Sequence, residues 1–232
     1  MRKIVILTGA GISAESGLGT FRDDGGLWSQ HRIEDVATPE GFARDPDLVH
    51  RFYSARRTQA AKAVPNAAHL ALAELQRRWS GPVVIITQNV DALHEAAGAE
   101  GVLHMHGVLA GALCTACGHR WPAPAEMTPQ TTCPACTAAT ARPDVVWFGE
   151  IPYHLEEILT HVQEADLFAS IGTSGQVHPA AGLVQEAAAQ GAQTVELNLE
   201  PSEISRAFDI RRLGPATELV PAWVAQLLRP EG

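Results

Sequence analysis

The sequence lacks three features that would place it in other classes of protein. No apolar run approaches the roughly 18 residues that a membrane-spanning helix requires. Positive charge is scarce, because 17 Lys and Arg face 26 Asp and Glu, for a net charge of −9. That balance argues against direct nucleic-acid binding. No internal repeat is apparent. We therefore expect a globular protein that needs neither a membrane nor a nucleic acid.

A secretory signal is also missing, since Arg2 and Lys3 are followed at once by the predicted strand 4–8, too short for a signal-peptide core. We expect a cytoplasmic location, where cysteines serve as metal ligands more often than as disulfides. The four cysteines form two pairs, Cys114-x-x-Cys117 and Cys133-x-x-Cys136, with fifteen residues between the pairs. This spacing predicts a structural zinc site whose four thiolates leave no position for water. Unligated thiols or a redox pair are the alternatives.

The first predicted strand, 4–8, runs directly into Gly9-Ala10-Gly11-Ile12-Ser13-Ala14. A buried strand followed by G-x-G-x-x-A is typical of a dinucleotide-binding turn, in which the glycines allow a tight turn and close approach of the backbone to a pyrophosphate. The usual second strand, ending in an acid about 20 residues later, is absent here. Glu200, after the predicted strand 193–197, is our candidate for the residue that holds the adenosine ribose. An exposed glutamate without that role is the alternative.

Strands and helices alternate along the rest of the 232 residues. Predicted strands at 83–87, 166–171 and 193–197 alternate with helices that begin after Asp45 and Asn66 and with helices over 155–165 and 180–190. This pattern indicates an α/β protein with a Rossmann-like, doubly wound parallel sheet. We expect residues 144–149 to return to that sheet. Polar residues follow the strand 83–87, where such sheets bind ligands, although Asn89 or Asp91 could simply cap the next helix.

Taken together, the segments GAGISAESGLGTFRDDGGLW, TQNVD, HMHG, the paired CxxC, WFGE, GTS and NLE resemble the sirtuin family of NAD-dependent protein deacylases. The resemblance spans nearly the whole chain. It implies one catalytic domain over 1–232, with a helical insertion at 30–65 and a zinc-binding module at 108–143. It also implies NAD+ as a consumed co-substrate, one structural Zn2+, and acyl-lysine proteins or peptides as partners. We expect a monomer.

The resemblance also implies roles for individual residues. His106, before the glycine of HMHG, would be the general base that acts on a ribose hydroxyl, a task that suits an imidazole with a pKa near neutrality. His104 would be supporting structure. From the spacing alone, His104 and His106 lie on the same side if residues 101–107 are extended. Asn89 and Asp91 would join His106 in catalysis. The implied NAD contacts are Gly9, Ala10, Gly11, Ile12, Ser13, Glu15, Ser16, Thr20, Phe21, Arg22, Trp28, Gln88, Asn89, Val90, Asp91, Gly172, Thr173, Ser174, Asn198, Leu199, Glu200 and Ala216.

For the substrate, the resemblance implies that a peptide lies as an added strand against Val146, Phe148, Gly149 and Val177. Tyr53 and Arg56 are three residues apart on a predicted helix and so share a face. Family members with this Tyr-x-x-Arg pair remove negatively charged acyl groups, and a guanidinium can bind a carboxylate through two hydrogen bonds. The expected activity is therefore removal of succinyl, malonyl and acetyl groups. Alternatively, Arg56 lies on a solvated helix face.

Three other functions stay open at this stage. Protein mono-ADP-ribosyl transfer uses the same co-substrate and differs in its product. A non-catalytic NAD-sensing module would not need His106. An oxidoreductase would reduce NAD rather than release nicotinamide.

Overall fold

The structure is a computed structural model that describes residues 2–19 and 31–229. The chain divides into two compact units. The first unit combines Met1–Gly17, Val64–Met105 and His154–Gly232, and the second combines Leu18–Ala63 and His106–Tyr153. Each unit is thus assembled from segments that are distant in the sequence.

The first unit is built on a six-stranded parallel sheet with the order β3-β2-β1-β7-β8-β9. Val5 in the central strand β1 pairs with Val84 on one side and Phe168 on the other. Strands β1 and β7 are buried throughout, as expected for apolar runs covered on both faces. The strands are β1 (Ile4–Thr8), β2 (Val83–Thr87), β3 (Leu103–His104), β7 (Leu167–Ile171), β8 (Gln193–Asn198) and β9 (Ile210–Leu213).

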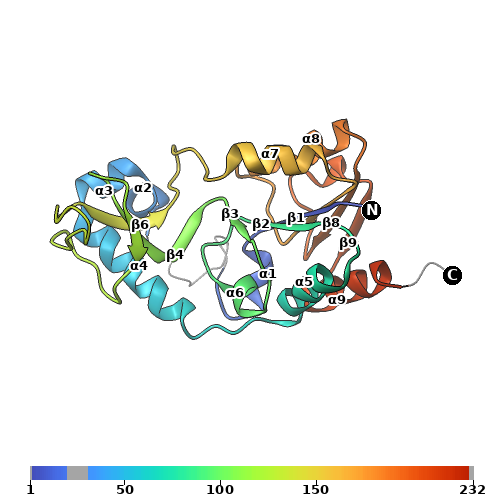
Figure 1. Ribbon diagram of the computed structural model, residues 1–232, viewed down its shortest axis with the longest axis horizontal. Coiled ribbons are helices and arrows are strands. Elements are labelled where there is room, and N and C mark those ends of the chain that lie inside the picture. Colours follow the sequence, from blue (N-terminus) through green and yellow to red (C-terminus); the bar gives the residue numbers. More distant parts are fainter. Residues whose placement is uncertain (1, 20–30, 230–232) are drawn as a thin grey trace. The chain divides into compact units, whose positions relative to one another are not determined.

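Helices cover both faces of this sheet (Figure 1). On one face, Leu72 and Leu75 of α5 (Ala67–Arg78) and Trp223 of α9 (Ala216–Leu227) join one apolar cluster. On the other, Ile158 of α7 (Leu155–Gln163) and Leu183 of α8 (Leu183–Ala189) join a second cluster. The short helices α1 (Gly11–Ala14) and α6 (Leu93–Ala96) follow β1 and β2. The doubly wound parallel sheet is therefore confirmed.

The second unit contains an antiparallel sheet with the order β5-β4-β6. Its strands are β4 (Gly107–Cys114), β5 (Arg120–Pro122) and β6 (Ala141–Val145). Three helices from the earlier segment join it: α2 (Ile33–Val36), α3 (Pro39–Arg44) and α4 (Pro46–Ala60). Asp45 accepts a hydrogen bond from the Leu48 N–H at 2.9 Å, which explains why α4 begins there.

One local expectation was wrong, and two other features differ from what the sequence indicated. Residues 144–149 do not return to the main sheet, because β6 pairs with β4 in the small sheet and Trp147 and Phe148 follow in a loop. An apolar run predicts a buried strand but does not say which sheet it joins. The condition for His104 and His106 to share one side, an extended stretch, is not met, because the chain turns at Met105 and His106 between β3 and β4. Strand β9 was not expected at all.

Two short 3₁₀ turns are also found among residues 2–19 and 31–229. The first, Ala180–Gly182, precedes α8, so the predicted helix 180–190 begins as a 3₁₀ turn. The second, Ser205–Ala207, precedes β9. Among the described residues, no helix is both long and apolar enough to cross a membrane.

Candidate active site and metal centre

The two glycine loops after β1 and β7 pack backbone against backbone. A Cβ on Gly11 would lie 2.7 Å from Gly172 Cα, and one on Gly172, whose φ is +63°, would lie 2.4 Å from the Ile12 nitrogen. The Gly9 and Gly11 N–H groups donate to the carbonyl oxygens of Ile171 and Gly172 at 3.0 and 2.8 Å. The strand order reverses between β1 and β7, so this contact marks the switch point where open α/β sheets bind ligands.

Three polar side chains of the first unit meet beside this contact. The Asn89 amide, only 8% exposed, donates to the Gly9 carbonyl and to Ser13 Oγ, each at 3.1 Å. The Ser13 hydroxyl donates to Asp91 at 3.1 Å, and Asp91 also accepts the Leu93 N–H at 3.1 Å. Burial raises the pKa of Asp91. The structure thus brings Ser13, Asn89 and Asp91 together, and Asp91 also caps the turn that leads into α6.

Two buried histidines, His69 and His94, pack against each other next to Ser13 and Thr8, and no sequence motif indicates either of them. The Asn66 N–H donates to Nδ1 of His69, so the His69 hydrogen lies on Nε2, which faces Ser13 Oγ at 3.4 Å. His94 Nε2 lies 2.9 Å from the Thr8 hydroxyl. Burial lowers the pKa of His69 to about 4 and that of His94 to about 3, so both are neutral. A single histidine on an amphipathic helix gives no sequence signal for these contacts.

His104 links the loop after β2 to α6. Its Nδ1 lies 3.1 Å from the Asn89 carbonyl oxygen and its Nε2 lies 2.7 Å from the Glu95 carboxylate. Burial lowers the pKa of His104, but the Glu95 hydrogen bond and charge outweigh it, and the net shift is upward. Because both partners are acceptors, only the doubly protonated ring can donate to both. These contacts are compatible with the supporting role predicted for His104, and Glu95 is a partner that the sequence did not reveal.

Other predicted nucleotide residues of the first unit lie near the carboxyl ends of strands or directly after α1. The Asn198 amide donates to the Thr173 carbonyl oxygen at 2.7 Å, which links the loops after β8 and β7. Glu15 accepts the N–H and hydroxyl of Thr217 at 3.0 and 2.6 Å, so this carboxylate caps α9. Leu199 is 68% exposed, and Glu200 is exposed beside it.

For several other predicted residues of this unit, the structure gives mainly their burial. Ser16 accepts a hydrogen bond from the Asn66 amide at 2.9 Å, and Ser174 accepts one from the Gln176 N–H at 3.3 Å. The remaining residues are half-buried, apart from the buried Ile12: Ala10, Ile12, Gln88, Val90, Val177 and Ala216. Thr20, Phe21, Arg22 and Trp28 lie outside the described residues.

His106 belongs to the second unit, in the turn that opens β4. It is half-buried, and its carbonyl oxygen accepts the Val146 N–H at 2.9 Å. Phe148, 44% exposed, donates its N–H to the Ala37 carbonyl at 3.0 Å. Gly149 is exposed and has a φ of +91°. The structure thus brings the predicted base and the predicted peptide segment together within one unit.

Tyr53 on α4 is 3% exposed, and its phenol oxygen accepts the Trp147 indole N–H at 3.0 Å. Burial raises the pKa of Tyr53 to about 12, although the positive charge of Arg56 opposes the shift. Arg56 is half-buried, with its guanidinium carbon 5.9 Å from the centre of the Phe52 ring. The positive charge of Arg56 therefore influences the phenol of Tyr53, three residues earlier on α4. Because its side chain is half-buried, Arg56 does not lie on a fully solvated helix face.

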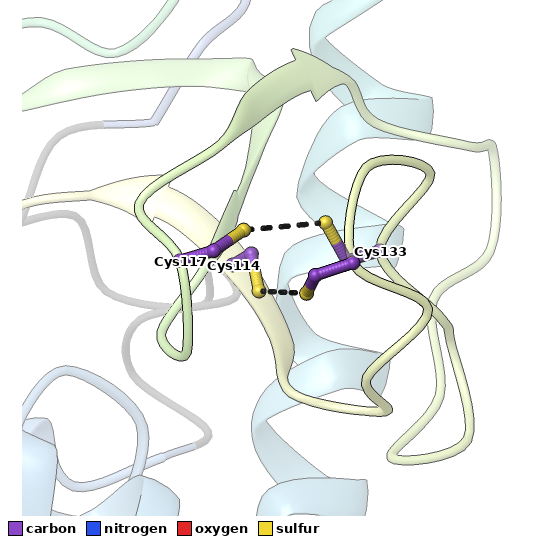
Figure 2. Close-up of side chains that lie close together, drawn as sticks. Cys114, Cys117 and Cys133 are labelled. Atoms are coloured by element: carbon purple, nitrogen blue, oxygen red, sulfur yellow. Dashed lines mark hydrogen bonds between the residues drawn. The ribbon is translucent and has the colours of Figure 1, made fainter.

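The four cysteines of the second unit form a single cluster (Figure 2). Their sulfur atoms lie within 4.8 Å of one another, with Cys114 and Cys136 3.6 Å apart and Cys117 and Cys133 3.7 Å apart. Four thiolates about 2.3 Å from a tetrahedral zinc ion would lie about 3.8 Å apart, so the cluster fits Zn2+. Such a closed shell is structural, as expected.

Comparison with known proteins agrees with this geometry. The Sir2 family model matches residues 9–179. An NAD-dependent protein deacylase of Caulobacter vibrioides is 55% identical over 230 residues, 97% of each chain. One from Escherichia coli strain K12 is 52% identical over 230 residues, which cover 98% of this chain and 82% of the relative. A solved Sir2 homolog–NAD complex superposes with a TM-score of 0.90 at 38% identity, covering 98% of this chain and 91% of that one.

The fold and the site define an α/β protein with a switch point at which such sheets bind nucleotides and with a four-cysteine cluster that fits zinc. The chain belongs to the Sir2 family.

Proposed function

We propose that this chain is an NAD-dependent protein-lysine deacylase that removes acidic acyl groups, succinyl and malonyl, as well as acetyl. Family membership and 55% identity to a protein deacylase support the reaction class. The proposed partners are acyl-lysine proteins or peptides. The observation that carries the acidic preference is that the buried Tyr53 and the half-buried Arg56 lie three residues apart on α4, and so on one face of it.

In the proposed reaction, NAD supplies the ribose that accepts the acyl group, and acyl-lysine, NAD and water become lysine, nicotinamide and 2′-O-acyl-ADP-ribose. His106 takes a proton from a ribose hydroxyl as general base. Asn89 and Asp91 bind the ribose and carboxamide of NAD, and their orientation is fixed by Ser13, as seen in the first unit. Phe148 and Gly149 bind the substrate backbone, and the zinc ion only stabilises the fold.

The acyl specificity follows from charge. A guanidinium and a phenol hydrogen can together bind a terminal carboxylate, whereas an acetyl group offers no charge to either. A positive charge that is half withdrawn from water is also costly to keep in a pocket built for an apolar chain. We therefore assign Arg56 and Tyr53 to the acid end of the acyl group.

The test compares acetyl-, malonyl- and succinyl-lysine versions of one peptide, with products identified by mass spectrometry. Arg56→Met should lower kcat/KM for succinyl-lysine about 100-fold, the loss of one desolvated charge pair, and leave the acetyl value within about threefold. Arg51→Met, on an exposed position of the same helix, is the control and should leave the substrate ratio unchanged. Equal losses on both substrates in Arg56→Met would remove the acidic assignment.

His106→Tyr should abolish turnover of all three peptides without unfolding the protein. Turnover that needs no NAD, or that survives this change, would contradict the mechanism. Modified protein carrying ADP-ribose instead of free lysine would indicate mono-ADP-ribosyl transfer. We further propose a monomer in the cytoplasm, where reduced thiols can hold zinc, which sedimentation and cell fractionation can check.

A further inference from the structure

Trp147 is held from three sides within the second unit. Its indole N–H donates to the Tyr53 phenol oxygen at 3.0 Å, and its backbone N–H donates to Glu150 at 2.8 Å. The guanidinium carbon of Arg142 lies 3.4 Å from the centre of its ring. Arg142 in turn donates to both oxygens of Glu150, at 2.6 and 2.9 Å. The indole is therefore fixed in both position and orientation.

This contact decides how the phenol of Tyr53 can bind a ligand. An indole N–H is a donor only, so the Tyr53 oxygen has to accept that hydrogen bond. A phenol hydrogen prefers the plane of the ring, where it has two positions, and repulsion from the indole hydrogen disfavours the nearer one. The Tyr53 hydrogen therefore turns to the other position and is available to donate. Within the part of the chain that the structure describes, Trp147 is the one hydrogen-bond partner of this oxygen.

The charges around Trp147 also favour the Tyr53 hydroxyl as a hydrogen-bond donor. The bidentate pair with Glu150 compensates the positive charge of Arg142, which is 8% exposed. Arg142 therefore acts on the pocket through the position of the indole and leaves charge recognition to Arg56. An indole donor also increases the acidity of the phenol that it contacts, which makes the phenol a stronger donor to an anion.

We propose that Trp147 is a positioning residue for acyl specificity, which sets the Tyr53 hydroxyl as a donor to the carboxylate of an acidic acyl group. Arg142 and Glu150 hold the indole in place for this purpose. The inference rests on the proposed function, because only an acyl chain with a terminal acceptor makes use of that donor. A methyl group, as in acetyl-lysine, does not.

The kinetic test is Trp147→Phe, which keeps an aromatic face for Arg142 and removes the indole N–H. We expect kcat/KM for succinyl-lysine to fall about tenfold, mostly through a higher KM, with the acetyl-lysine value within about twofold. Trp223→Phe, at a buried tryptophan of the first unit, is the control for losing a buried indole and should leave the substrate ratio unchanged. An equal loss on both substrates in Trp147→Phe would show a merely structural role and overturn the inference.

A double-mutant cycle separates positioning from packing. In a Tyr53→Phe background, Trp147→Phe should cause no further loss on succinyl-lysine, because the donor that Trp147 orients is already gone. Additive losses would overturn the inference.

An NMR measurement makes the test independent of turnover. The sequence has five tryptophans, so the indole N–H region of a ¹⁵N spectrum holds few peaks, and Trp147→Phe identifies the relevant one. Tyr53→Phe should shift that resonance and speed its exchange with solvent, and an unchanged resonance would overturn the inference. If the resonance shifts but wild-type protein shows no succinyl turnover, the proposed acidic preference is wrong and the assigned role for Trp147 ends with it.

Discussion

The six-stranded sheet of the first unit lies between two apolar clusters, whereas the apolar cluster of the small sheet contains Ala112, Met127 and Ala141, with Trp121 and Ala123 packed against it. The second unit also buries apolar side chains of its helices, such as Val49 and Phe52, and it adds the four-cysteine cluster and the ion pair of Arg142 with Glu150. We attribute the difference to the size of the sheets, because a three-stranded sheet buries less apolar surface than a six-stranded one and gains more from a metal site. Four experiments address this contrast, from the largest expected effect to the smallest.

Removing the metal should unfold the second unit and spare the first. A structural zinc site contributes on the order of 10 kcal/mol, more than the stability of most whole domains. Chelation, or Cys133→Ser, should therefore abolish hydrogen-exchange protection in β4 to β6 while β1 and β7 stay protected. Added zinc should restore protection to the chelated protein but not to the variant. Simultaneous loss of protection in both units would contradict the contrast.

Leu72→Ala should destabilise the first unit through a cavity. Leu72 is 0% exposed, and removing its side chain should lower the free energy of unfolding by about 3 kcal/mol. Leu70→Ala, two residues earlier on α5 and 54% exposed, should change it by less than about 0.5 kcal/mol. Urea unfolding followed by circular dichroism measures both. Similar losses in the two variants would mean that α5 is not held by its apolar face.

Glu150→Gln should destabilise the second unit by about 2 kcal/mol, because it leaves the buried charge of Arg142 without its partner. Asp35→Asn breaks an exposed pair with Arg44 in the same unit and should cost less than about 0.5 kcal/mol. Thermal unfolding of the zinc-loaded proteins gives the comparison. A negligible effect of Glu150→Gln would leave zinc as the dominant force in the second unit.

His104→Gln should give the smallest effect, and one that depends on pH. The raised pKa of His104 means that its contribution is complete below the ordinary value near 6.5 and is lost as pH rises through the raised one. The lowered pKa of Glu95 means that its contribution is complete above about 4.5 and is lost as pH falls through the lowered one. At any pH between about 5 and 6.5, the free energy of unfolding of the variant should thus be about 1 kcal/mol lower than that of the wild type. The difference is small because Glu95 is partly exposed.

Urea unfolding of the wild type and His104→Gln at a series of pH values checks this window. The difference in free energy of unfolding should shrink above pH 7. A difference that is constant between pH 5 and 9 would mean that the imidazolium is not what stabilises this link.

The sequence was sufficient for features that depend on local patterns. Strand 83–87 and the helices that begin after Asp45 and Asn66 follow from apolar runs and capping side chains, and the cysteine spacing predicted the metal centre. It was insufficient where the partner is distant. Nothing near Val145 says that its strand joins the small sheet, and nothing near His69 indicates that it contacts Ser13.

The candidate site divides in the same way. Motifs named Asn89, Asp91 and His106, and the spacing of Tyr53 and Arg56 indicated a shared helix face. Glu95 and the contact of Trp147 with Tyr53 depend on chain separations of 9 and 94 residues, which no periodicity encodes. The roles of the nucleotide-contact residues remain predictions.

The contact between the loops of Gly11 and Gly172 also limits how this protein can change. Neither position tolerates even a methyl group, since each added carbon would meet backbone rather than a movable side chain. The two loops can therefore diverge only together, in evolution or in the laboratory. Engineering that aims to alter co-substrate preference has to keep this backbone contact and substitute neighbouring residues instead, such as Ala10 and Thr173.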